Sequence, residues 1–378
     1  MGRKSAGDSS IYKGADGRWH GLVSMGVKQG GERDRRHVAA LKRADVVAKV
    51  RALEQQRRDG VVLAGGRMPT VQEWTELWLE TIASRRIRPR TSDGYRTCLV
   101  KIHHELGHHR LDRLQPEHLE AFYRQLRDDG LAPATVLLHH RVLSRALKVA
   151  VQRGRIARNV ATLVDAPALT RAEVRPLNAA EARQLLHAAT STANGARWSV
   201  ALALGLRQGE ALGLRWDDID LDAGVISIRR ALQRQTGKGL QLVAPKSRAG
   251  RRSIKMPEQL RTALVQHREL QRQEQAAAHE LWEDQGFVFC QANGRPIDPR
   301  RDWANWKALL VAAGVRDARL HDARHTAATL LLQQGVPARV AMQVLGHSQI
   351  GLTLGTYSHV VPELAQEAAD RMGEALWG

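Results

Sequence analysis

The chain has 378 residues, a formal net charge of +19 and an isoelectric point near 10.8. Its length favours two or three domains, and a hydrophobic content of 43% excludes a wholly disordered protein. No apolar run approaches the roughly 20 residues that cross a bilayer, and the polar N-terminus does not have the pattern of a signal peptide. The only two cysteines, Cys98 and Cys290, exclude a disulfide scaffold and a cysteine zinc site and fit a reducing compartment.

The positive charge favours a polyanionic partner, either nucleic acid or an anionic membrane surface. It is spread along the chain, with net charges of +8, +5 and +6 over residues 1–67, 68–170 and 171–378. A single basic tail would concentrate the excess in one block, so this spread predicts that several segments contact the same polyanion. The alternative is an arginine-rich protein with solvated faces. The membrane is the weaker choice, because the basic residues do not gather on one amphipathic helix.

Residues 1–66 are predicted to form a small β-β-β-α domain. Strands at 10–13 and 18–27 flank Ala15-Asp16-Gly17, which is a hairpin signal. A third short strand is expected to hold Arg33 and Arg35, and a helix is expected over 39–58. The side chains predicted to face the core are Trp19, Val23 and Met25 of the second strand and Leu41, Ala44, Val47 and Val50 of the helix.

Residues 68–166 are predicted to form an all-α helical bundle. Thr70 and Glu73 have the spacing of a capping box, which begins the first helix. Thr91 begins the second helix, and Pro116 and Pro133 open the third and the fourth. Short links between four helices are typical of a bundle. The stretch 165–175 has the composition of an interdomain linker.

Residues 174–378 are predicted to form a mixed, mainly α domain with a small antiparallel sheet. The sheet is expected to use strands at 225–228, 241–243 and 253–256, with a basic turn joining the last two. Helices are expected over 178–189, 196–206, 257–278, 299–313, 321–334, 337–345 and 362–376.

Several polar residues of this last region have spacings that suit a phosphate. His321 and Arg324 lie three positions apart on one helix, so both can donate to the same oxygens; the alternative is a capped helix start with surface charges. Arg207 follows an apolar helix with Glu210 three residues on, which also fits an ordinary ion pair. Lys246 lies on a turn and can reach a leaving oxygen or a DNA phosphate, unless the loop is only solvated.

The end of the chain adds a histidine and a tyrosine. His347 follows an apolar helix, and Tyr357 comes ten residues later. Tyrosine is scarce in this chain, with four in all, so Tyr357 is a candidate for a functional role. The alternative is a structural role, because a lone tyrosine is more often a core or rim residue.

Other chemistries are not indicated. The chain has no Walker-type phosphate loop and no acidic cluster of the kind used by two-metal nucleases. The spacing of His103, His104, His108 and His109 fits no familiar zinc site. We therefore expect no cofactor and no metal.

In chain order, Arg207, Lys246, His321-x-x-Arg324, His347 and Tyr357 resemble the tyrosine recombinase (phage integrase) family. The matching segments are Gly-Leu-Arg-Gln-Gly-Glu at 205–210, Pro-Lys-Ser at 245–247, His-Asp-Ala-Arg-His-Thr at 321–326, Leu-Gly-His-Ser at 345–348 and Thr-Tyr-Ser-His at 356–359. The helical segment 68–166 resembles the family's core-site-binding domain, and the N-terminal region resembles its arm-site-binding domain. The resemblance thus implies DNA-binding domains at 1–66 and 68–166 and a catalytic domain at 174–378.

The resemblance also implies a role for each matched residue. Tyr357 matches the nucleophile that forms a 3′-phosphotyrosyl link and frees a 5′-hydroxyl. Arg207 and Arg324 match the pair that stabilises charge on the phosphoryl oxygens, Lys246 the general acid, and His321 the histidine that assists proton transfer at the tyrosine. His347 matches a phosphate-binding residue and Glu210 a supporting acid. For DNA contacts outside the active site, we expect Arg33, Arg35, Arg248, Arg251 and Arg252.

Some positions differ from the family's common pattern. Ala323 stands where leucine is frequent, and Gly355 where an acidic residue is frequent. Gly351 and Gly355 suggest a tyrosine loop that is mobile until DNA and a neighbouring subunit order it. After Tyr357, one face of a short helix carries Leu364, Ala368, Met372 and Leu376. In the family such a tail docks on a neighbouring protomer of a tetramer; the alternative is packing within its own chain.

The sequence therefore predicts a site-specific DNA integrase that integrates and excises a phage or other mobile element. Its expected partners are double-stranded arm and core attachment sites, three further copies in a homotetramer, and an excisionase or DNA-bending protein, with no membrane. The expected location is the cytoplasm of a bacterial host, at the nucleoid. The alternatives are a chromosome-dimer resolvase, a type IB topoisomerase, and a non-catalytic DNA-binding regulator with a retired recombinase domain. The attachment-site sequences and the direction of recombination are not encoded in recognisable motifs.

Overall fold

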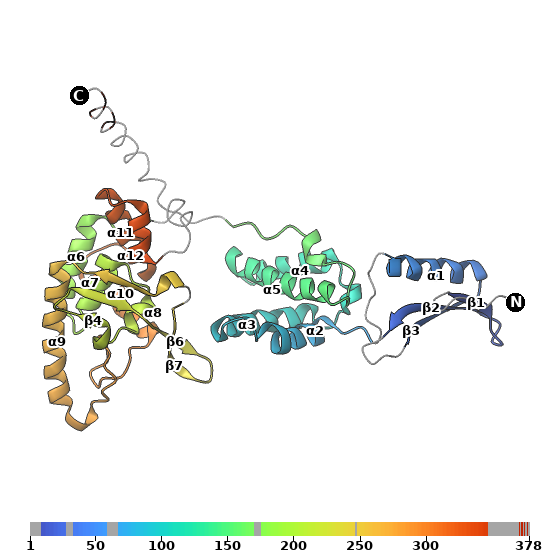
Figure 1. Cartoon of the computed structure of the whole chain (residues 1–378), viewed down its shortest axis with the longest axis horizontal. Helices are drawn as coiled ribbons and strands as arrows, with labels where there is room; N and C mark the ends of the chain where they lie inside the picture. The colour runs from blue at the N-terminus through green and yellow to red at the C-terminus, as the bar shows by residue number, and fades with distance from the viewer. Residues whose placement is uncertain are drawn as a thin grey trace. The chain divides into compact units, whose positions relative to one another are not determined.

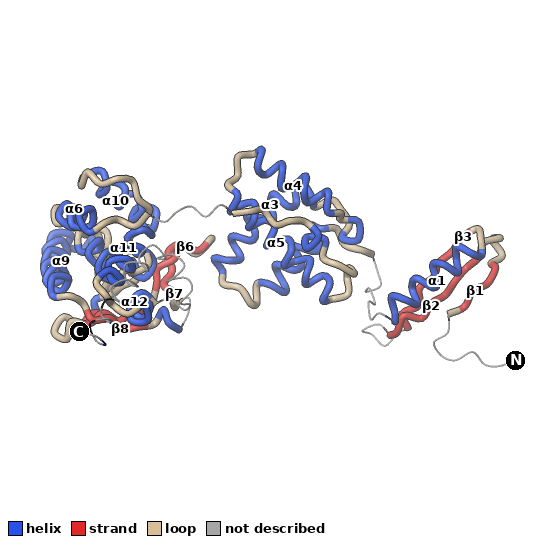
Figure 2. The backbone as a smooth tube through the Cα atoms, turned by 90° about the horizontal axis from the view of Figure 1, so that it is seen from above, coloured by secondary structure: helices blue, strands red, loops and turns tan. Residues whose placement is uncertain are grey.

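The structure, a computed structural model, describes residues 9–27, 33–58, 67–169, 175–245 and 248–346, with isolated helical positions at 370, 372, 374 and 376. The chain divides into two compact units, Met1–Arg171 and Ala172–Gly378. Figures 1 and 2 show the elements of each unit. Among the described helices, none is long and apolar enough to cross a membrane.

The first unit begins with an antiparallel sheet of β1 (Ser10–Lys13), β2 (Trp19–Val27) and β3 (Arg33–Ala40), in that order. Helix α1 (Arg43–Arg58) covers one face of this sheet (Figure 1). The period of two along β2 points Val23 and Met25 toward the helix, where they pack with Val46 and Val50. The predicted order of three strands and one helix is confirmed.

The predicted start and apolar stripe of this helix are partly wrong. The helix begins at Arg43 and not at 39, because Ala39 and Ala40 still pair with β2 in the sheet. Leu41 precedes the helix and is 76% exposed. Counting 3.6 residues per turn from Arg43 puts Val46, Val50 and Leu53 on the sheet side in place of Ala44 and Val47.

The rest of the first unit is helical, as predicted. Trp74 and Trp78 are almost fully buried in its core, and the Trp74 indole donates a hydrogen bond of 2.9 Å to the Ala146 carbonyl oxygen. The capping box of Thr70 and Glu73 is present. The helices are α2 (Val71–Leu77), which continues into a π-helical segment (Trp78–Ala83), α3 (Pro89–Leu106), α4 (Pro116–Asp128) and α5 (Pro133–Gln152).

The second unit combines helices with two small antiparallel sheets. One sheet has the order β4-β5-β8 and the other pairs β6 with β7. The strands are β4 (Ile219–Asp220), β5 (Val225–Ile228), β6 (Ala231–Gln235), β7 (Gly239–Val243) and β8 (Arg252–Lys255). The helices are α6 (Ala179–Ala189), α7 (Ala196–Leu204), α8 (Gln208–Leu212), α9 (Glu258–Ala278), α10 (Pro299–Ala312), α11 (Leu320–Gln333) and α12 (Ala338–Leu345).

The predicted pairing of the strands around the basic turn is wrong. β7 pairs with β6 and β8 pairs with β5, so the stretch between β7 and β8 connects two different sheets. The strand β6 was missed because its sequence, Ala-Leu-Gln-Arg-Gln, has no apolar alternation. The turn between β6 and β7 contains Gly237 and is followed by Gly239, both with positive φ, which favours a local hairpin over a longer connection.

Helix α7 organises the second unit because nearly every side of it is buried. Its core side chains include Trp198, Val200 and Leu204, and it packs against α6, α9 and α11. The helix ends at Gly205, which has φ +60°. This left-handed end turns the chain sharply toward Arg207.

Of the predicted C-terminal helix over 362–376, positions 370, 372, 374 and 376 are helical, and the side chains of Met372 and Leu376 are 58% and 61% exposed. The remaining residues of that segment lie outside the described part of the chain.

We expect Gly205→Ala to destabilise the second unit more than Gly224→Ala does. Both residues have positive φ, which costs an alanine about 1 kcal/mol. A Cβ at Gly205 would also lie 2.5 Å from Leu345 Cδ2 and 3.2 Å from the Ala327 Cβ, whereas nothing lies within 4 Å of a Cβ at Gly224. Such overpacking costs about 1–3 kcal/mol more. Differential scanning calorimetry of the full chain measures both losses, and equal losses would contradict the crowding argument.

Candidate active site

The turn after α7 places Arg207 immediately before α8. Arg207 Nη1 donates to Glu210 Oε1 over 2.7 Å, and the Arg207 backbone N–H donates to Glu210 Oε2 over 3.2 Å. The Arg207 side chain is 42% exposed, whereas that of Glu210 is 5% exposed. The predicted pair therefore forms, and the buried carboxylate holds a guanidinium that still reaches solvent.

Helix α11 carries His321 and Arg324 on one side of its first turn. Arg319 precedes this turn and is paired with the buried Asp322, which also accepts the Arg319 backbone N–H. Arg324 is 2% exposed. Its Nη1 and Nη2 each donate over 2.6 Å, to the carbonyl oxygens of Gly205 and Leu345. Arg324 thus joins the end of α7 to the end of α12.

Three arginines from three segments donate to three successive carbonyl oxygens at the end of α12. Arg252 Nε reaches Val344 over 2.7 Å, Arg324 Nη2 reaches Leu345 over 2.6 Å, and Arg207 Nη2 reaches Gly346 over 3.1 Å. The last carbonyls of a helix have no partner within it and carry partial negative charge, so they attract cations. We call Arg207, Arg252 and Arg324 the arginine cluster.

Glu210 is the carboxylate of this cluster. Besides Arg207, it accepts a hydrogen bond of 3.1 Å from Arg252 Nη2. Burial alone raises the pKa of Glu210, but the charges and hydrogen bonds of Arg252 and Arg207 outweigh it, and the pKa is lowered below its ordinary value of 4.5. Glu210 is therefore ionised at neutral pH.

His321 is a weak base in these surroundings. Loss of water around the ring is the main cause, followed by the nearby His325, Arg324 and Arg207, and together they lower its pKa from 6.5 to about 4. The residue nevertheless keeps an exposed surface, so water screens part of this effect. At neutral pH the imidazole is uncharged, so it can accept a proton.

His321 and Arg324 line a cavity of about 160 Å³ with Gln208 and Trp303. The side chain of Trp303 is 53% exposed at its rim. A small cavity lined by a guanidinium and a neutral imidazole suits an anionic group such as a phosphate. The described residues therefore bring together Arg207, Glu210, His321 and Arg324 of the predicted set.

Lys246, His347 and Tyr357 lie outside the described residues. In the sequence, Lys246 lies between β7 and β8, and His347 directly follows the anchored Gly346. Their predicted roles remain predictions.

The phage integrase family matches residues 169–363 of the chain. An integrase from Saccharopolyspora erythraea is 40% identical over all of this chain and 98% of its own length. The chain belongs to the phage integrase family. It is a tyrosine-type site-specific recombinase, as its sequence predicted.

Three further comparisons accompany this assignment to the phage integrase family. An integrase from Streptomyces ambofaciens is 26% identical, covering 97% of this chain and 96% of that relative. A Tn1549 transposon integrase in complex with transposon right end DNA has a TM-score of 0.67 at 22% identity, over 80% of this chain and 99% of that one. A lambda integrase dimer bound to a COC′ core site has a TM-score of 0.56 at 15% identity, over 94% and 96%. These two structures establish the integrase fold.

The arginines predicted to contact DNA occupy different environments in this integrase. Arg33 and Arg35 are exposed on β3, and Arg251 is exposed just before β8. Arg248 lies in a short 3₁₀ turn, and its side chain is outside the described residues. Arg252 does not fit a DNA-contact role, because its side chain is 6% exposed, its donors are used within the protein and, unlike Arg324, it does not line the 160 Å³ cavity.

A buried ion pair near the active site of this integrase was not predicted. Arg197 and Asp302 are 1% and 2% exposed and form two hydrogen bonds of 3.1 and 3.2 Å. Gln208 Nε2 also donates to Asp302 over 3.0 Å, which ties α8 to α10. A single arginine within the apolar sequence Ala-Arg-Trp-Ser-Val-Ala-Leu-Ala-Leu was the available signal, since such a charge needs a buried partner.

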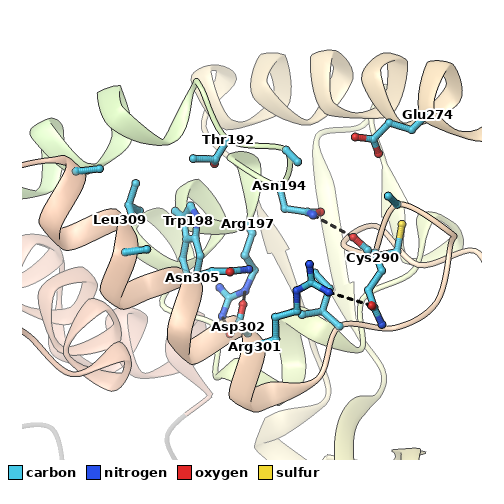
Figure 3. Close-up of a pocket in the computed structure, with 16 residues that line it drawn as sticks. Thr192, Asn194, Arg197, Trp198, Glu274, Cys290, Arg301, Asp302, Asn305 and Leu309 are labelled. Carbon is cyan, nitrogen blue, oxygen red and sulfur yellow. Dashed lines mark hydrogen bonds and ion pairs between the residues drawn. The ribbon is translucent and has the colours of Figure 1, made fainter.

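Arg197 and Asp302 also line a larger pocket of about 440 Å³, drawn in Figure 3. On the opposite side of the pocket, Asn194 Nδ2 donates to the Cys290 carbonyl oxygen over 3.0 Å. Arg197 is the residue that this pocket shares with the 160 Å³ cavity.

We expect His321→Asn to make stability less sensitive to acid. Below about pH 6.5 the unfolded chain protonates His321, whereas the folded protein resists this until about pH 4, so His321 reduces the free energy of unfolding as pH falls through this range. The variant should therefore lose less stability between pH 6.5 and 4.5. Urea unfolding at several pH values measures this. The control is His104→Asn, where the side chain is 82% exposed; identical slopes for His321→Asn and the unsubstituted chain would contradict the argument.

Proposed function

We propose that this recombinase integrates and excises a mobile genetic element by cutting and rejoining DNA at attachment sites through a 3′-phosphotyrosyl intermediate. The observation that carries the proposal is that His321 and Arg324 line one small cavity. Arg207, held by Glu210, lies close enough to His321 to contribute to its lowered pKa. The full-length similarity to an integrase supports a mobile element as the substrate's origin.

In the proposed reaction, the Tyr357 hydroxyl oxygen attacks the scissile phosphorus. A phosphorus–oxygen bond to the tyrosine forms while the bond to the 5′ oxygen breaks. His321 assists removal of the tyrosine proton, since its lowered pKa leaves it uncharged at neutral pH. Lys246 donates a proton to the departing 5′ oxygen. Rejoining is the reverse step with the 5′-hydroxyl of another strand, so one phosphodiester bond is made for each one broken.

Arg207 and Arg324 would stabilise the charge that builds on the two non-bridging oxygens, and His347 would donate to the same phosphate. Their backbone anchors support this role, because donors fixed before the substrate arrives need no reorganisation during the reaction. The exposed surface of Arg207 is consistent with direct contact to the phosphate.

We further propose that residues 1–66 bind arm sites, residues 68–166 bind core sites, and residues 174–378 catalyse the reaction. The alternation of exposure along β3 supports the first assignment, since Arg33 and Arg35 lie on the exposed positions of the strand. Assembly as a homotetramer on DNA, help from an excisionase or a DNA-bending protein, and action at the host nucleoid belong to the same proposal.

The nearest alternatives predict different products. A chromosome-dimer resolvase would not need an arm-binding domain, and a non-catalytic regulator would form no covalent link. A type IB topoisomerase would relax any supercoiled plasmid equally well. Arg207 is held by Glu210 while 42% of its side chain stays exposed, and this favours a catalytic domain over a retired one.

We expect the unsubstituted chain to form a covalent adduct with a nicked suicide DNA substrate, and Tyr357→Phe to form none. Loss of the hydroxyl removes the nucleophile while DNA binding remains. Denaturing gel electrophoresis with labelled DNA measures the adduct. Tyr123→Phe is the matched control, because the buried Tyr123 forms a hydrogen bond with His140 in the helical core of the first unit. This substitution should leave adduct formation intact. An adduct with Tyr357→Phe would refute the assignment.

We expect replacement of both Arg33 and Arg35 by alanine to weaken binding to arm-site DNA. It should also reduce the slope of log affinity against log salt by about 2, since each lost phosphate contact removes about 0.9. Fluorescence anisotropy at several salt concentrations measures this. Arg36→Ala is the control, because Arg36 is half-buried on the other side of β3 next to Asp34. Slower adduct formation on a substrate that holds only core sites would contradict a purely arm-binding role.

A further inference from the structure

Arg252 is an arginine that the reaction described above does not use. It is the first residue of β8 and pairs with Ile228 of β5, and the neighbouring Ile254 is buried in the core. Its side chain is 6% exposed. Arg252 also does not line the 160 Å³ cavity that Arg324 lines, so its guanidinium is placed to hold other groups in position and not to contact DNA.

The Arg252 guanidinium joins two parts of the active site. Its Nε donates to the Val344 carbonyl oxygen over 2.7 Å, and its Nη2 donates to Glu210 Oε2 over 3.1 Å. A third hydrogen bond of 3.2 Å, from Nη1 to the Gly250 carbonyl oxygen, fixes the plane of the group. Only the planar fork of arginine can reach such partners together, because a lysine ammonium has its donors on one atom.

The two partners of Arg252, Glu210 and Val344, connect it to Arg207. Glu210 uses its other oxygen, Oε1, to accept Arg207 Nη1, and Gly346, two residues after Val344, accepts Arg207 Nη2. The contact at Gly346 is close, since a Cβ there would lie 2.7 Å from Arg252 Nη1. Arg252, Glu210, Arg207 and Gly346 therefore form a closed ring of contacts.

We propose that Arg252 is a positioning residue that acts through Glu210 and the end of α12 to aim Arg207 at the scissile phosphate. This rests on the proposed function, in which Arg207 contacts the non-bridging oxygens. The alternative is an ordinary buried ion pair that only stabilises the fold. The two differ in what a mild substitution does to the transition state once the protein is folded and bound to DNA.

The test compares Arg252→Lys with the unsubstituted full-length chain in single-turnover adduct formation at saturating protein. Under these conditions the rate constant does not depend on the fraction of folded protein. Two suicide substrates are used, one with a normal scissile phosphodiester and one with a neutral methylphosphonate there. The second substrate lacks one charged oxygen, so it depends less on a correctly aimed arginine.

We expect Arg252→Lys to slow the reaction on the phosphodiester about 10–100-fold, the usual effect of losing a group that orients an active-site residue. On the methylphosphonate the slowing should be several-fold smaller, as it should be for Arg207→Ala. The double variant Arg207→Ala, Arg252→Lys should be no slower than Arg207→Ala, because the two residues act as one unit. Arg261→Lys on α9 is the control, since Arg261 forms an exposed pair with Glu258.

Equal slowing on both substrates, additive effects in the double variant, or no slowing would each overturn the proposal. Glu210→Gln provides a second variant if Arg252→Lys does not fold; it must show the same difference between substrates, and equal slowing would count against the proposal. Absence of any Tyr357-dependent adduct with the unsubstituted chain would instead overturn the proposed function, so the two failures are distinguishable.

Discussion

The active site depends on which donors form hydrogen bonds with the last carbonyl oxygens of the short helix α12. The last carbonyl oxygens of α12 have no partners within the helix, and Arg252, Arg324 and Arg207 supply them in sequence order. Each arginine comes from a different element, so this one stretch of backbone fixes their relative positions. The arrangement of the site therefore follows from a hydrogen-bonding requirement of the backbone.

Electrostatics explains why such a cluster is useful. Three guanidinium groups would repel one another, and partial charges at the helix end together with Glu210 offset that repulsion. The offset is incomplete, since one carboxylate faces three cations among the contacts described. Burial is the main cause of the lowered pKa of His321, and the positive charge of Arg324 and Arg207 adds to it. The same positive charge favours a bound phosphate.

The sequence allowed the main chemistry to be predicted because recombinase motifs are local. Gly205 to Glu210 and His321 to Thr326 are short segments whose residue types indicate their chemistry, and the capping signal at Thr70 located a helix start correctly. Arg252 was misassigned because three arginines in five residues look alike in a sequence. Their surroundings in the structure distinguish them, since Arg251, just before β8, is exposed, whereas the side chain of Arg252, the first residue of β8, is 6% exposed. The pairing of the strands also depends on tertiary contacts that the sequence does not show. The sequence of β6 lacks the alternation of apolar and polar residues that indicates a strand.

The contacts that build the arginine cluster join residues far apart in the chain. Arg207 and Gly346 are separated by 139 positions and Arg252 and Val344 by 92. Contacts of such long range carry a large loop-closure cost, which slows their formation. A chain that is still being synthesised has its first unit before it has α12. Such a chain would lack the assembled arginine cluster, so it would not cleave DNA until the whole second unit has folded.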